Sequence, residues 1–147
     1  MPGPNYGLAK AYKLPAATSS EVPIYSALVK GSSVQEADLP ASLGDLPLGV
    51  LYETATVDDI KDGRAFQVRV EGSAFCIAGE AIDDGDFVVA DTDGTVLSTA
   101  SGNGGEPGED TTFYALGIAR SATTEAGQLV VVQLQVGLPI AGPASGA

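Results

Sequence analysis

Residues 68–98 read VRVEGSAFCIAGEAIDDGDFVVADTDGTVLS, and this stretch decides the fold class. It consists of short apolar runs separated by turn residues. In residues 66–71 the apolar and polar side chains alternate, which is the two-residue period of a strand with one buried face. The segment Asp91-Thr92-Asp93-Gly94 lies between two further apolar runs and predicts a hairpin turn. The stretch therefore predicts consecutive short strands joined by tight turns.

The same pattern extends in both directions along the chain. No window of 11–18 residues has helical periodicity, and residues 34–47 predict a loop with room for one helical turn. We predict eight strands, over residues 22–30, 48–56, 66–71, 74–78, 87–90, 95–97, 113–119 and 129–136. This pattern is typical of an all-β fold, either a small β-barrel or β-tulip-like domain or a sandwich, with an extended N-terminal arm.

The expected organisation is one β domain between two extended ends. The domain covers residues 21–136, and residues 137–147 predict a flexible tail. Residues 99–112 hold glycines, acidic residues and no large apolar side chain, and they predict an exposed loop.

Two segments of the domain resemble one another. Leu48-Gly49-Val50 leads through a turn that ends at Gly63 into the valine-containing strand FQVRV. Leu116-Gly117-Ile118 leads through a turn that ends at Gly127 into LVVVQL. This resemblance is compatible with an internal duplication, and chance in an all-β chain is the alternative.

Residues 1–20 predict an extended arm that makes contacts. Three prolines and two glycines oppose a helix there. The arm nevertheless carries apolar side chains, which leave apolar surface in water unless they dock. They dock either on a partner or on the arm's own domain. The candidate contact residues are Tyr6, Leu8, Lys10, Tyr12, Lys13 and Leu14.

Composition excludes several classes of function. The 147 residues contain no His and a single cysteine, so Ser-His-Asp and Cys-His catalysis, His-ligated metals and an intrachain disulfide are excluded. A net charge of −12 without a basic stripe disfavours nucleic-acid binding. The longest run of large apolar residues, 129–132, is far shorter than a membrane span.

The acidic residues predict turns, and a metal site or a carboxylate enzyme is the less favoured alternative. Asp83, Asp84 and Asp86 surround Gly85, but EF-hand spacing is absent, and turn formation is the ordinary role of such residues. Cys76, in GSAFCIAG, is expected to be a small buried side chain. We expect no catalytic residues, no cofactor and no metal.

Residues 48–136 resemble the cement proteins, or head decoration proteins, of tailed-phage capsids. The resemblance rests on Val70-Glu71-Gly72, on residues 78–82, on the turn residues between Gly85 and Gly94, and on the ending Leu116–Ala119 with Val130–Leu134. It implies a compact β-barrel-like domain, a homotrimer, and a non-enzymatic virion protein on the outer capsid surface. The implied partner is the major capsid protein, which the arm would contact. The alternative is another β-rich virion component of a tail, fibre or baseplate.

Overall fold

The computed structural model describes residues 8–145, and nearly all of its regular structure is β-strand. The strands are β1 Ala9–Lys13, β2 Ala27–Lys30, β3 Ala37–Asp38, β4 Pro47–Leu51, β5 Ala65–Arg69, β6 Ser73–Ile77, β7 Phe87–Ala90, β8 Val96–Ser98, β9 Thr112–Ala119 and β10 Leu129–Ala141, with one helix, α1 Val57–Lys61. The all-β prediction is confirmed. The described strands form two open antiparallel sheets, so a sandwich-type arrangement holds and a closed barrel does not.

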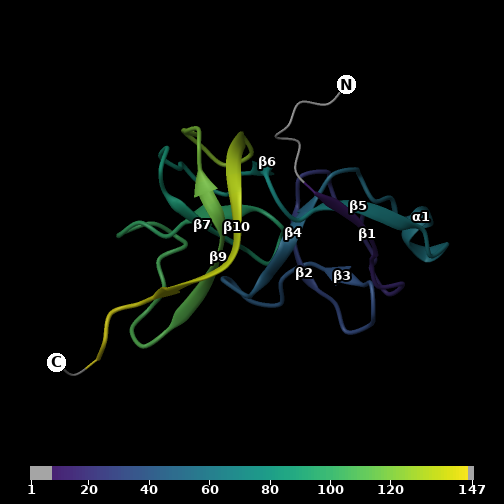
Figure 1. The fold of residues 1–147 in the computed structure, drawn as a ribbon, viewed down its shortest axis with the longest axis horizontal. Coiled ribbons are helices and arrows are strands. Elements are labelled where there is room, and N and C mark those ends of the chain that lie inside the picture. The colour runs from purple at the N-terminus through teal and green to yellow at the C-terminus, as the bar shows by residue number, and fades with distance from the viewer. Residues whose placement is uncertain (1–7, 146–147) are drawn as a thin grey trace.

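The two sheets have the same strand order. The first is β1-β5-β4-β2-β3, and the second is β6-β10-β9-β7-β8. Each strand of the second sheet therefore occupies the same place as the strand numbered five lower in the first sheet, so that β6 corresponds to β1 and β10 to β5. We call residues 8–71 unit 1 and residues 72–145 unit 2; they lie side by side in Figure 1.

The strand registers repeat as well. Gly49 of β4 and Gly117 of β9 occupy the same place, because a Cβ on either would overlap the carbonyl oxygen of the next strand, Arg69 or Gln133. Glycine is needed where two backbones approach this closely. The repeated Leu-Gly dipeptides of the sequence thus mark equivalent positions of a structural duplication.

Each unit contains its own hydrophobic cluster. Residues of unit 1 alone, among them Leu28, Phe66 and Val68, form one cluster. The other belongs to unit 2 but also takes in Ala27 and Val50 of unit 1. These two residues pack the units together, and β4 lies at the centre of the molecule (Figure 1).

Two segments differ from the sequence prediction. α1 occupies a stretch for which no helix is expected; it begins at the cap Thr56, whose hydroxyl accepts a hydrogen bond from the Asp59 N–H, and it is too short for periodicity to reveal. β3 lies in the predicted loop 34–47. Residues 99–112 form a mostly exposed loop, as predicted, and the Glu80 carboxylate holds this loop beside β8 by accepting hydrogen bonds from the N–H groups of Gly104 and Ser98.

The two predicted ends also contain strands. β1 lies within the predicted arm and pairs with β5 along its whole length, from Ala9 opposite Arg69 to Lys13 opposite Ala65. β10 continues to Ala141, within the predicted tail, past an irregularity between Leu134 and Leu138. Gly137 adopts φ 95° at this irregularity, a conformation that glycine reaches without strain.

Candidate interaction surface

The predicted arm residues fall into two groups. Tyr12 packs against the core of unit 1, and Leu14 is buried in it. Leu8, Lys10 and Lys13 are exposed. Tyr6 lies outside the described residues. The arm was expected to dock either on a partner or on its own domain. Residues 12 and 14 dock on their own domain.

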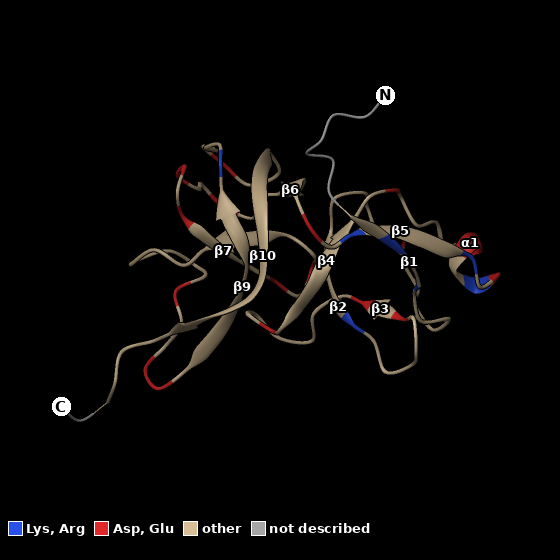
Figure 2. Ribbon diagram, in the orientation of Figure 1, with Lys and Arg blue, Asp and Glu red and all other residues tan. Residues whose placement is uncertain are grey.

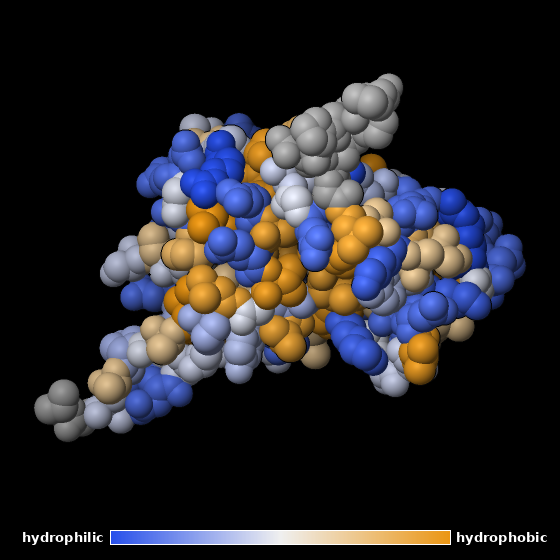
Figure 3. Space-filling model, viewed as in Figure 1, coloured by the Kyte–Doolittle hydropathy of each residue, from blue (hydrophilic) through white to orange (hydrophobic). Residues whose placement is uncertain are grey.

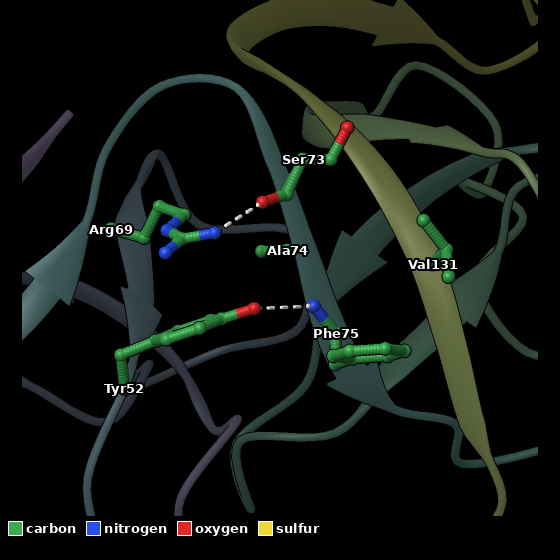
Figure 4. A pocket seen from close by; sticks show the side chains of 6 residues that line it. All are labelled: Tyr52, Arg69, Ser73, Ala74, Phe75 and Val131. Atoms are coloured by element: carbon green, nitrogen blue, oxygen red, sulfur yellow. Dashed lines mark hydrogen bonds between the residues drawn. The ribbon is translucent and has the colours of Figure 1, made fainter. Parts of the chain in front are cut away.

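A pocket of about 190 Å³ lies where the two units meet. Its walls come from β5, β6 and β10 and from Tyr52, which directly follows β4 (Figure 4). The lining residues are Tyr52, Arg69, Ser73, Ala74, Phe75 and Val131. No sequence pattern pointed to this site, because its residues come from four separate segments.

Side chains of unit 1 cover the free edge of β6 in this pocket. The Arg69 Nη1 donates to the Ser73 carbonyl at 2.9 Å, and the Phe75 N–H donates to the Tyr52 hydroxyl at 3.1 Å (Figure 4). The Arg69 guanidinium also stacks on the Tyr52 ring, 4.0 Å from its centroid. An edge strand with unpaired backbone groups invites association with other chains. The two side chains remove that hazard and lock the units together.

Tyr25 completes an aromatic group at the junction. Its ring centroid lies 5.3 Å from that of Tyr52 and 5.6 Å from that of Phe75. Its φ is 74°, whereas the equivalent turn of unit 2 has Gly85 at 95°. The equivalence is secure because the Tyr25 N–H donates to Leu51 as the Gly85 N–H donates to Ala119. A side chain is thus held in a glycine conformation, a form of strain that often marks functional sites.

The outer faces of the two sheets differ at equivalent positions. In unit 2 the outward side chains of β6 and β10 are Phe75, Ile77, Leu129 and Val131, paired across the strands. The same register positions in unit 1 hold Ala11, Lys13, Ala65 and Gln67, all exposed. Phe75 is 44% exposed and Leu129 is 47% exposed. Unit 1 therefore has the ordinary solvated face of this fold, and unit 2 has an apolar one.

Arginines flank this apolar face. Arg69 lines the pocket beside Val131, and its Nε is buried without a partner among the described residues. The Arg120 Nε donates to the Gln133 side chain on β10. Strands β6, β9 and β10 contain no acidic residue. We call Phe75, Ile77, Leu129 and Val131, with Arg69 and Arg120, the junction surface.

A second apolar surface lies at the far end of β10. Residues 112–115 of β9 and 138–141 of β10 pair as a ribbon that runs away from both sheets (Figure 1). Leu46 is 58% exposed, Leu138 is 41% exposed, and Val136 is also exposed. Gly137 brings Leu46 alongside the ribbon, since a Cβ there would lie 3.4 Å from the Leu46 Cδ1.

Carboxylates flank this second surface. Asp45 precedes Leu46 in the sequence, and Glu109 and Asp110 precede the ribbon strand of β9. Hydrogen bonds with Ser145 lower the pKa of Asp110, so it is charged at neutral pH. Residues 37–51, 99–119 and 129–147 contain no lysine or arginine. We call Leu46, Val136 and Leu138, with these three carboxylates, the ribbon surface.

The basic residues are distributed unevenly between the two units. Six of the seven basic residues lie in unit 1, and Arg120 is the exception. Figure 2 shows the blue segments gathered over unit 1 and red ones spread over both units. On the face in Figure 3, hydrophobic side chains gather in the middle of the molecule, and the outer ends are mostly hydrophilic.

The described residues offer no reactive centre. No cluster of potential metal ligands occurs among residues 8–145. Cys76 is fully buried, and burial raises the pKa of its thiol far above the ordinary range. Such a thiol stays protonated and unreactive. No helix within the described part of the chain is long and apolar enough to cross a membrane.

Two apolar surfaces of opposite flanking charge lie on this all-β scaffold, and exposed apolar patches are typical of sites of contact between proteins. Comparison with protein families identifies the kind of protein: residues 17–134 match the phage cement protein family. The match spans most of the chain, so this chain belongs to the phage cement protein family, a family of virion structural proteins. The predicted resemblance is confirmed.

A solved structure shares the fold. The N base of the head fibre gp8.5 of bacteriophage phi29 matches with a TM-score of 0.58 and 21% identity, over 87% of this chain and 93% of that one. Comparison with curated proteins finds no match. At this level of identity the likeness shows the shared fold alone.

Proposed function

We propose that this protein binds the outer surface of an assembled phage capsid and stabilises the shell. The observation that carries the proposal is the family match, which covers both units. The proposed partner is the major capsid protein, and the proposed state on the shell is a cyclic homotrimer. One feature of β10 supports a trimer. Val130 and Val132 are buried on its inner side, but Leu129 on its outer side stays exposed, and a neighbouring copy would cover it.

The arm contributes contacts to the shell in this proposal. Leu8, Lys10 and Lys13 are exposed near the start of the described chain, and Tyr6 precedes them in the sequence. The lysines would meet carboxylates at the rim of the interface, where each pair adds about 0–1 kcal/mol. Tyr12 and Leu14 would act indirectly, because they hold β1 on the domain.

The test uses phage particles that lack this chain. A cement protein binds the assembled shell and not the free subunit, so it stabilises the shell by mass action. We expect such particles to assemble, to release DNA at a lower temperature, and to regain stability when purified protein is added. Failure of the shell to assemble without this chain would indicate a scaffold or shell role instead.

A fibre component is the second candidate. The fold shared with a head fibre base favours it, and such a component would sit at the foot of a projecting structure. An electron-microscopy map of the native particle distinguishes the two. Density of this size spread flat over the shell supports the cement role, whereas density beneath a fibre, or on the tail, supports the alternative.

A further inference from the structure

The junction surface and the ribbon surface are complementary. One has apolar side chains flanked by Arg69 and Arg120 and has no carboxylate on its strands. The other has apolar side chains flanked by Asp45, Glu109 and Asp110, within stretches free of basic residues. Opposite charges around two apolar centres favour their association and oppose the pairing of like surfaces.

The two surfaces cannot meet within one chain. Both include residues of β10, with Leu129 and Val131 near its start and Leu138 near its end. A strand rises about 3.3 Å per residue, so the nine steps from Leu129 to Leu138 place these two residues up to roughly 30 Å apart along the strand. Only another molecule can bring a ribbon surface to this junction surface.

The duplicated fold shows that the junction face is specialised. Its four apolar residues replace Ala11, Lys13, Ala65 and Gln67 at the same register positions. The fold itself therefore tolerates small and polar residues there. Phe75 packs in part on Tyr25, but much of Phe75 and Leu129 stays exposed, which leaves apolar surface available to a partner.

We infer that the ribbon surface of one copy docks on the junction surface of a second copy. This contact is heterologous, since each copy uses two different surfaces, and heterologous contacts build rings when the rotation closes. The inference deepens the trimer part of the proposed function by naming the two surfaces that meet. Leu138 and Leu46 would lie against Phe75 and Val131, with the carboxylates beside the arginines.

The experiment measures the oligomeric state of the full chain by analytical ultracentrifugation. A junction variant carries Phe75→Ala and Val131→Gln, which are the residues of unit 1 at these positions. A ribbon variant carries Leu46→Gln and Leu138→Gln. Each variant should be monomeric, with a dissociation constant raised roughly ten-fold or more. Val34→Gln is the control, because Val34 is 90% exposed outside both surfaces, and it should assemble as the unaltered chain does.

Mixing the two variants tests the heterologous geometry. The ribbon of the junction variant and the junction of the ribbon variant are both intact, so the mixture should form a dimer and no larger ring. Added salt should weaken assembly, because Arg120, Glu109 and Asp110 among the flanking charges are exposed. An unaltered chain that stays monomeric, variants that assemble normally, or a mixture that stays monomeric would overturn the inference.

Capsid binding is measured separately on the same proteins. If the unaltered chain binds capsids but does not self-associate, the ribbon-to-junction contact is wrong and the cement role stands. If it forms the ring but ignores capsids, the cement role is wrong and the contact stands. If the junction variant assembles normally but no longer binds capsids, the junction surface faces the shell, and the inference is overturned.

Discussion

At the strained turn of Tyr25 we predict that a glycine variant is more stable than an alanine variant, which is the reverse of the usual order. Tyr25 has φ 74°, and its N–H donates to the Leu51 carbonyl at 2.7 Å, so the conformation is held by the sheet. We compare Tyr25→Gly with Tyr25→Ala. Both remove the ring and its contacts with Tyr52 and Phe75, so those losses cancel in the comparison.

The magnitude follows from the backbone alone. A residue with a Cβ in the left-handed conformation costs about 1–2 kcal/mol, which glycine avoids. Glycine loses roughly 0.4–1 kcal/mol more conformational free energy on folding than alanine. The difference leaves Tyr25→Gly more stable than Tyr25→Ala by about 1 kcal/mol, or roughly 2–4 °C in Tm at this chain length.

The assay is urea unfolding followed by circular dichroism, with thermal unfolding as a second measure. Phe75 provides the matched control, because it lies in β6 with an ordinary strand conformation. At Phe75 the order should be normal, with glycine less stable than alanine by roughly 0.5–1 kcal/mol. An alanine variant at position 25 that equals or exceeds the glycine variant in stability would refute a left-handed Tyr25.

Three further predictions concern the core. Leu14→Ala should lower the free energy of unfolding by about 2–5 kcal/mol in chemical denaturation, because Leu14 is buried in unit 1. A change below about 1 kcal/mol, which is nearer to the effect of a surface substitution, would mean that β1 is only an arm. Gly117→Ala should destabilise by about 1–3 kcal/mol, because the new Cβ overlaps the Gln133 carbonyl oxygen, whereas Gly108→Ala, in open surroundings, should change little. Burial raises the pKa of Cys76, so the thiol stays protonated in the folded state while it ionises in the unfolded state above about pH 8.5. Stability should therefore fall by about 1 kcal/mol between pH 8 and 9.5, and Cys76→Ala should remove this fall when unfolding is measured at both pH values.

Prediction from sequence succeeded where the signal is local. The runs at 87–90 and 113–119 were predicted as strands, and the structure has β7 at Phe87–Ala90 and β9 at Thr112–Ala119. The alternation of apolar and polar residues in 66–71 matches β5, in which Phe66 and Val68 are buried. Alternation of apolar and polar residues arises whenever one face of a strand is buried, so such a strand can be predicted without knowing which strand it pairs with.

The ends of the chain were harder to predict for the same reason. β1 carries two lysines and small alanines, so it has no strong strand pattern, and it forms because β5 presents an open edge to it. The end of β10 contains glycine and proline, which argue against a strand, yet pairing with β9 continues to Ala141. Pairing of this kind depends on a partner that lies far away in the sequence.

Sequence alone determined the all-β class, the absence of His-based and thiol chemistry, the acidic charge and the family resemblance, since each depends on composition or on short-range pattern. Only the tertiary structure decided the junction surface and the ribbon surface. Tyr52, Arg69, Phe75 and Val131 come together because β4, β5, β6 and β10 meet at the joint between the two units. The pairing of strands across long sequence separations, and not any local motif, places these side chains on one surface.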